Sequence, residues 1–293
     1  MKSLRITSCT ALLTALVGLV GPTVVSAAPS AGTPTPAGFW LAASDGGVFA
    51  YGTQFYGSAG AVPLVQPVVG IAEVPRTQTG TSSSCCLGYW LVASDGGIFT
   101  YGSAQFYGSL GNRTLSDKIV AMAATPSGNG YWLLGRDGTV YPFGDADHAP
   151  STHDAVPGPY VAIASTPSGN GYWLITDPGA VIPVGDARHF TVSGGAISNG
   201  KAIVGVAVHG LGTGLWIAGS DGSTVSLGDA PVLAPAAKKT SAPVVGIGSD
   251  LGDGYWLALA NGVVQNYGDA PPIGPQKPQA LNKPAVGIST IFR

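Results

Sequence analysis

Charged side chains are scarce in this chain, at 10% of its 293 residues. The chain also lacks a basic run. Lys2 and Arg5 lie near its start, and the remaining 11 of 13 basic residues stand against 15 acidic ones, a net charge of about −4. This balance argues against nucleic acid or an anionic membrane surface as the partner. Disorder is not indicated, because 45% of the residues are hydrophobic and disordered segments have low hydrophobicity.

Long apolar runs are confined to the start of the chain. Lys2 and Arg5 precede an apolar stretch over residues 6–20, and small residues follow at 25–28. This pattern predicts a secretory signal peptide over residues 1–27. An uncleaved membrane anchor is the alternative, but the run is short and a Gly-Pro pair breaks it. No later segment offers about 18 uninterrupted apolar residues. We therefore expect a secreted protein without a membrane span, extracellular or associated with the cell wall.

The composition changes again after the predicted signal. Residues 28–37 are rich in Pro, Ala and Thr and predict a short, extended tether. Residues 38–293 remain as one domain, which is long unless the fold grows by repetition.

Cysteine is almost absent from the predicted mature chain. Cys85 and Cys86 are adjacent and lie in the longest insertion of the sequence, residues 76–87. Secretion favours oxidised cysteines. We expect a vicinal disulfide between the two; a link to another chain, or free thiols, are the alternatives.

An internal repeat dominates the rest of the sequence. A Gly-aromatic-Trp motif, or a close variant, recurs six times at spacings of 50, 42, 41, 43 and 40 residues, and it uses all six tryptophans. Such a period is typical of repeat architectures. The six motifs begin at Gly38, Gly88, Gly130, Gly171, Gly214 and Gly254.

Each repeat predicts about four short strands. In the second repeat a strand over 89–94 is followed by the turn Asp95-Gly96, whose residue types suit a tight hairpin. A strand over 98–102, a short outer strand over 105–108 and a buried strand over 119–123 complete the unit. Because strands apolar on both faces must be covered on both faces, radial stacking as a propeller is favoured over a solenoid, which needs polar caps.

The two ends of the domain are complementary. The first repeat lacks its preceding buried strand, and a sixth copy of that strand occurs at 285–289. We therefore predict an all-β, six-bladed β-propeller that is closed when the C-terminal strand completes the first blade, which leaves no long open edge.

The motif Gly-Tyr-Trp-Leu-Val-Ala-Ser-Asp-Gly-Gly-Ile-Phe, followed by Phe-Tyr-Gly-Ser, resembles the repeat of secreted actinobacterial proteins of poorly defined function. There it occurs alone or beside cell-wall-hydrolase or peptidase domains. The layout is also similar to regulator-of-chromosome-condensation and tectonin-type lectin propellers. The resemblance implies a propeller but no particular activity, because propellers host many functions.

Candidate catalytic groups are few. Nine of the fourteen aspartates follow the repeat: five lie at hairpin turns, and Asp145, Asp186, Asp229 and Asp269 lie in Gly-Asp-Ala segments, where we expect each to bind nearby backbone amides. No nucleophile elbow, HExxH pair or phosphate loop is present. We expect neither catalysis nor a cofactor.

Three histidines are candidates for ligand contact. His148 and His189 follow equivalent Gly-Asp-Ala segments, and a zinc site that also uses His153 and Asp154 is one interpretation. We favour the alternative that His148 and His189 replace the Phe of Phe-Tyr-Gly. Equivalent positions on neighbouring blades diverge toward the rim, which would make the distances between zinc ligands too long. No metal is therefore expected.

The sequence favours a secreted binding module. Glycan of the cell wall or extracellular space is the expected ligand, with a protein-interaction scaffold of the cell envelope as the alternative and a hydrolase on the propeller face or channel as the second alternative. The candidate contact residues are Phe55, Tyr56, Phe106, Tyr107, His148, His153 and His189.

Overall fold

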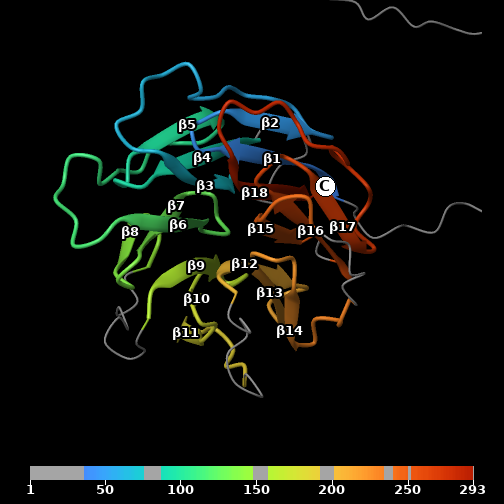
Figure 1. Cartoon of the computed structure of the whole chain (residues 1–293). Coiled ribbons are helices and arrows are strands. Elements are labelled where there is room, and N and C mark those ends of the chain that lie inside the picture. Colours follow the sequence, from blue (N-terminus) through green and yellow to red (C-terminus); the bar gives the residue numbers. More distant parts are fainter. Residues whose placement is uncertain are drawn as a thin grey trace, which may run out of the picture. The chain divides into compact units, whose positions relative to one another are not determined.

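The computed structural model describes residues 36–75, 87–147, 158–191, 201–233, 240–249 and 252–292. Every regular element within them is a β-strand (Figure 1). The same residues hold no helix that is long and apolar enough to cross a membrane. The predicted signal peptide lies outside the described residues, as does the predicted tether up to residue 35.

Eighteen strands form six antiparallel sheets of three strands each, arranged around a common centre (Figure 1). In each sheet an inner, a middle and an outer strand follow one another. The sheets are β18 (Ala285–Phe292), β1 (Pro36–Ala43), β2 (Val48–Tyr51); β3 (Val68–Glu73), β4 (Gly88–Ala93), β5 (Ile98–Gly102); β6 (Ile119–Ala124), β7 (Gly130–Gly135), β8 (Val140–Gly144); β9 (Tyr160–Ser165), β10 (Gly171–Thr176), β11 (Val181–Gly185); β12 (Ile203–His209), β13 (Gly214–Gly219), β14 (Thr224–Gly228); and β15 (Val244–Ser249), β16 (Gly254–Leu259), β17 (Val264–Gly268).

The C-terminal strand closes the ring as predicted. β18 pairs with β1, with Trp40 opposite Ser289 and Leu41 opposite Ile288. Around the centre each inner strand contacts the next, and β18 contacts both β15 and β3. Two segments from opposite ends of the domain therefore complete one sheet, and the six blades form a closed circle.

The expected fourth strand of each blade is not formed. In the second repeat, residues 105–108 are irregular. The backbone carbonyl of Gln105 instead accepts a hydrogen bond of 2.7 Å from Nε1 of Trp90. Because this segment turns inward to bind the N–H of the buried Trp90 indole, it does not pair with β5 as a fourth strand. The described sheets therefore have three strands.

The middle strands and their turns explain why the repeat forms sheets. All six residues of β4 are buried, because sheets cover this strand on both faces. At the hairpin that follows, Gly96 has φ of 79°, a conformation that favours glycine. Oδ1 of Asp95 accepts a hydrogen bond of 2.9 Å from the N–H of Gly97. The turn role expected for these aspartates is thus confirmed here and at Asp45, Asp137 and Asp221.

Neighbouring blades are joined by rows of aromatic side chains. Tyr89, which is fully buried, lies 4.8 Å from the ring of Trp40 in the preceding blade. Its hydroxyl donates a hydrogen bond of 2.5 Å to the carbonyl of Gly57, and Tyr131 repeats this bond with Gly108. The Gly-aromatic-Trp motif of one repeat therefore packs against the preceding repeat, so that the stability of a blade depends on its neighbours.

Candidate functional site

The two ends of the ring differ in the segments that they carry. Register places Glu73 opposite Tyr89, and Gly88 opposite Gly102. The C-terminal end of an inner strand, the start of the middle strand and the end of the outer strand therefore share one end of the ring, which we call the mouth face. The Asp-Gly hairpins lie at the opposite end, which we call the turn face.

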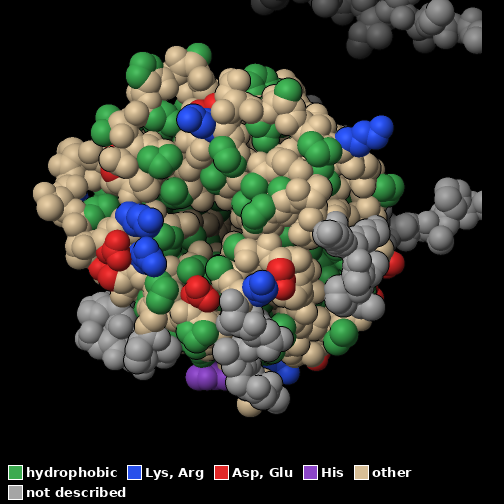
Figure 2. Space-filling model, in the orientation of Figure 1, with side chains coloured by type: hydrophobic (Ala, Val, Ile, Leu, Met, Phe, Trp, Pro, Cys, Tyr) green, Lys and Arg blue, Asp and Glu red, His purple; other side chains and the backbone are tan. Residues whose placement is uncertain are grey.

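A funnel opens at the mouth face along the axis of the ring. It has a volume of about 640 Å³ and is lined by the last residues of all six inner strands. Toward the turn face it narrows to a passage of about 120 Å³. Figure 2 shows the ring along its axis from the turn face, with a hollow at the centre where this narrow passage lies. The volume of the funnel falls within the range of small-ligand sites.

The walls of the funnel are mainly apolar. A ring of large apolar side chains is formed by Ile71, Met122, Ile163, Val206, Ile247 and Ile288. Nearer to solvent, alanines from four inner strands continue this apolar lining. Polar side chains concentrate on three consecutive inner strands, β15, β18 and β3, which contribute Ser249, Ser289, Thr290 and Glu73. Ser165 and Thr166 at the end of β9 add two hydroxyls on another side of the funnel, so most but not all of its polar lining lies on β15, β18 and β3.

The lip of the funnel is also apolar. Pro75, Pro126 and Pro167 occupy equivalent positions in three blades, and Leu211 lies in the corresponding loop of a fourth. The side chain of Leu211 is 84% exposed. Leu211 and the three prolines together give the rim of the cavity an apolar surface.

Two of the predicted contact residues are exposed at equivalent positions. Phe55 is 52% and Phe106 is 60% exposed. Each directly follows the residue whose carbonyl accepts the hydrogen bond from the repeat tryptophan, at Gln54 and Gln105. Because this segment follows the end of an outer strand, both phenyl rings belong to the mouth face.

Tyr56 and Tyr107 make structural contacts, and their contact with a ligand stays a prediction. Both are partly buried and lie against the tryptophans of their own blades, with ring centroids 6.2 and 6.5 Å apart. Their backbone N–H groups donate to the hydroxyls of Tyr89 and Tyr131. They therefore form part of the contact between blades.

His189 is exposed and takes the place of Phe106 in its own blade, because the preceding carbonyl of Arg188 binds Nε1 of Trp173 at 2.8 Å. This confirms its equivalence to the Phe of Phe-Tyr-Gly. His148 and His153 lie outside the described residues. Cys85 and Cys86 do as well, so the vicinal disulfide stays a prediction.

Two of the four Gly-Asp-Ala aspartates, Asp145 and Asp186, differ from expectation. Asp145 accepts hydrogen bonds from the hydroxyls of Thr125 and Ser127, at 2.8 and 2.6 Å. Asp186 is held in the same way by Thr166 and Ser168. Side-chain hydroxyls of the preceding loop, and not backbone amides, bind these carboxylates. The sequence signal was the shared Thr-Pro-Ser-Gly-Asn-Gly segment before β7 and β10.

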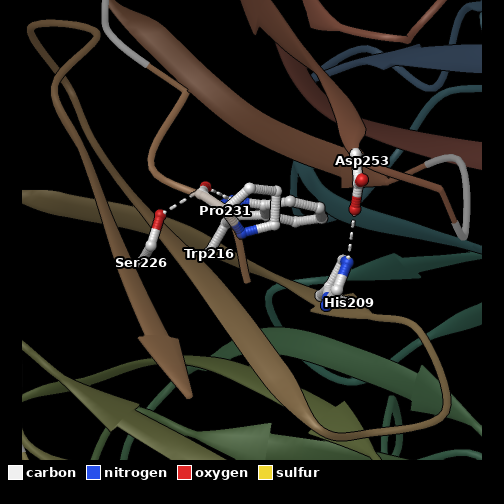
Figure 3. A network of polar contacts seen from close by, with 5 residues as sticks. All are labelled: His209, Trp216, Ser226, Pro231 and Asp253. Atoms are coloured by element: carbon white, nitrogen blue, oxygen red, sulfur yellow. Dashed lines mark hydrogen bonds and ion pairs between the residues drawn. The ribbon is translucent and has the colours of Figure 1, made fainter. Parts of the chain in front are cut away.

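A different pair occupies this position in the fifth blade, and sequence analysis missed it. His209 replaces the threonine, and its Nε2 lies 3.0 Å from Oδ1 of Asp253 in the next blade. The imidazole packs edge-on against Trp216, with centroids 4.9 Å apart. Figure 3 shows this pair beside the bonds from Trp216 and Ser226 to the carbonyl of Pro231.

These polar groups do not assemble a catalytic or metal-binding cluster within the described ranges. Groups of three or more His, Cys, Asp or Glu side chains able to hold a metal are not found there. His209 and Asp253 have no nucleophile bonded to them among these residues; Nδ1 of His209 is buried without a hydrogen-bond partner. What the mouth face offers chemically is a shaped cavity with apolar walls and hydroxyls.

Comparison with known proteins supports the architecture. No family model and no curated protein matches the chain. Among solved structures, a chain described as "Crystal structure of Nidogen/Laminin Complex" is similar, with a TM-score of 0.50 at 9% identity. The similarity covers 87% of this chain and 98% of that chain.

The fold is a six-bladed β-propeller. At 9% identity the similarity bears on the fold alone, so the resemblance to the actinobacterial repeat family is not confirmed by these matches. Propellers support many activities, so the function of this protein depends on the residues at the two faces of the ring.

Proposed function

We propose that this protein is a secreted, non-catalytic binding module that receives part of a partner protein at its mouth face. The observation that carries the proposal is the apolar funnel of about 640 Å³. Its lip includes Leu211, which is 84% exposed. A partner that covers this lip removes apolar surface from water, which contributes roughly 25 cal/mol for each Å² buried.

The distribution of ionisable groups supports binding over hydrolysis. Glu73 is the one ionisable side chain among the described residues that line the funnel. Acid–base chemistry ordinarily needs two or more such groups that converge on the reacting atoms. The hydrolase alternative therefore has no observation in its favour.

Glycan binding is a second candidate, favoured by one observation. Phe55 and Phe106 expose their rings at equivalent positions of adjacent blades on the mouth face. Exposed aromatic faces suit the apolar faces of sugar rings. The funnel itself supports this candidate less, because no aromatic side chain lines it within the part of the chain that the structure describes.

A display experiment separates the two candidates. A phage-displayed peptide library is selected on the whole secreted protein, and a glycan array and a peptidoglycan pull-down are run in parallel. Ala124→Phe fills the funnel from β6, and Phe55→Ser with Phe106→Ser removes the exposed rings. We expect selected peptides to bind wild type and the Ser double variant, and to lose at least tenfold in affinity for Ala124→Phe.

Other outcomes would redirect the proposal. Glycan binding that is abolished in the Ser double variant and kept in Ala124→Phe would replace the protein partner with a sugar. Peptides that bind Ala124→Phe as tightly as wild type would show that the funnel is not the site. Secretion is tested separately by sequencing the N-terminus of protein from the culture medium, which we expect to begin near Ala28.

A further inference from the structure

Charge is segregated between the two ends of the propeller. Among the described residues, the mouth face carries seven acidic side chains and a single Lys or Arg, Arg188. The acidic residues follow the outer strands or join inner to middle strands, and they are Glu73, Asp145, Asp147, Asp186, Asp229, Asp253 and Asp269. The described part of this end of the ring therefore has an excess of negative charge.

The turn face is balanced. Its hairpins and the segments that precede the inner strands hold six acidic and six basic side chains in the described ranges. The acidic residues are Asp45, Asp95, Asp117, Asp137, Asp177 and Asp221, and the basic ones are Arg113, Lys118, Arg136, Lys201, Lys277 and Lys283. Figure 2 shows the turn face, where basic and acidic side chains lie close together.

Most of the negative charge at the mouth face has no basic partner among the residues that the structure describes. Arg188 lies 3.7 Å from Asp229, and His209 lies against Asp253. Asp145, Asp147, Asp186 and Asp269 make no ion pair with the described Lys and Arg residues. Hydroxyl groups bind Asp145 and Asp186, which orients these carboxylates and leaves their charge in place. A rim of one sign around a low-dielectric cavity attracts ligands of the opposite sign.

The funnel supplies an independent indication of a ligand. Ser249 and Thr290, on the adjacent strands β15 and β18, are each only 8% exposed and line the cavity. Neither hydroxyl has a hydrogen-bond partner among the residues that the structure describes. Ser289, next to Thr290 on β18, differs, because its oxygen accepts a hydrogen bond of 2.9 Å from the N–H of Glu73 on β3. Both hydroxyls, of Ser249 and Thr290, face the cavity, where water or a polar group of a ligand can bond to them.

We infer that the ligand of the mouth face is a basic peptide segment that carries an apolar side chain. The apolar side chain enters the funnel among Ala124, Ala207 and Val208. Peptide N–H and C=O groups bond to the hydroxyls of Ser249 and Thr290, and lysine or arginine side chains lie over the acidic rim. This inference rests on the proposed function and adds the charge and chemistry of the partner segment.

Three pools of acetylated, amidated octapeptides test it on the whole secreted protein. All pools share randomised apolar residues at the central positions, and the flanking positions hold Lys, Ser or Glu. Retention on immobilised protein is measured by mass spectrometry. We expect the Lys pool to be retained roughly tenfold more than the Ser pool, and the Glu pool least. Raising NaCl from 50 to 500 mM should remove most of this difference, because the Debye length shortens severalfold.

Two matched charge variants locate the effect. Asp147→Asn with Asp269→Asn removes two charges from the mouth face at side chains that make no hydrogen bond among the described residues. Asp117→Asn with Asp177→Asn removes two charges from the turn face. We expect the first variant to lower retention of the Lys pool about threefold to tenfold and the second to leave it unchanged.

The outcomes distinguish the inference from the proposed function. Equal retention of all three pools, lost in Ala124→Phe, would overturn the charge preference and leave funnel binding intact. Lys-pool retention that survives in Ala124→Phe, or that falls equally in both charge variants, would overturn the inference by placing the peptides elsewhere. Absence of retention for every pool would overturn both.

Discussion

Nε2 of His209 lies 3.0 Å from Oδ1 of Asp253, and this contact crosses from one blade to the next. In two other blades the equivalent residues, Thr125 and Thr166, bind an aspartate of their own blade. One substitution within the repeat therefore changes a bond within a blade into a bond between blades. It does so beside the loop that carries Leu211, at the lip of the funnel.

Substitution at this pair should separate charge from packing. Asp253 is 66% exposed, whereas His209 is 13% exposed and packs on Trp216. We expect Asp253→Asn to lower the free energy of unfolding by less than about 1 kcal/mol. His209→Ala should cost more, about 1–3 kcal/mol, because it also removes contact with the indole. Urea unfolding measures both; equal losses would show that the ion pair, and not packing, determines the contribution of His209.

The tyrosines between blades offer a second matched comparison. The hydroxyl of Tyr89 donates to the carbonyl of Gly57 and accepts from the N–H of Tyr56. The hydroxyl of Tyr172 is buried without a partner in the described part of the chain. We expect Tyr89→Phe to cost about 1–3 kcal/mol, because it leaves partners unsatisfied, and Tyr172→Phe to be neutral or stabilising. Thermal and urea unfolding of both variants check this, and a larger cost at Tyr172 would contradict it.

Alkaline pH should destabilise the propeller. Burial raises the pKa of Tyr89 and of Tyr172 to about 12, from an ordinary value of 10. The unfolded chain then ionises at lower pH than the folded protein, so the contribution of these tyrosines is complete below pH 10 and is lost as pH rises toward 12. We expect the urea midpoint to fall over this window. Tyr172→Phe should flatten the fall, and an unchanged slope in that variant would contradict the assignment.

Closure of the ring can be tested by removing β18. This strand forms the inner position of the first blade and contacts both β15 and β3. A chain ending at residue 284 should lose cooperative unfolding, because loss of β18 opens the edge of the first sheet at β1 and removes the packing against β15 and β3. Returning residues 285–293 as a separate peptide should restore near-ultraviolet circular dichroism. A truncated chain that unfolds cooperatively at the wild-type midpoint would contradict the role of β18.

Much of this architecture could be predicted from the sequence, because it depends on local signals that recur. Six tryptophan motifs gave the number of blades, Asp-Gly pairs gave the hairpins, and the extra strand at 285–289 gave the closure. The prediction of a fourth strand was wrong, because the indole N–H of Trp90 binds the backbone of the segment 105–108. That competition depends on tertiary contact and leaves no trace in strand propensity.

The candidate site was harder to predict for the same physical reason. Phe55 and Phe106 are exposed as expected, but Tyr56 and Tyr107 are used between blades. The funnel is assembled from single residues of six strands far apart in the sequence. The charge segregation had a visible signal, because the Gly-Asp-Ala segments recur after every outer strand from β8 onward. Only the register shows that these segments share the end at which the funnel opens.

The position at which a bound peptide touches the propeller tests the proposed site most directly. A photo-reactive benzophenone placed among the apolar residues of the Lys pool is cross-linked to the whole protein, and the attached residues are mapped by mass spectrometry. We expect attachment at the lip and upper wall of the funnel, at Pro126, Pro167, Leu211 and Thr290. Attachment confined to the turn face, for example at residues 110–118, would contradict the assignment of the mouth face as the binding surface.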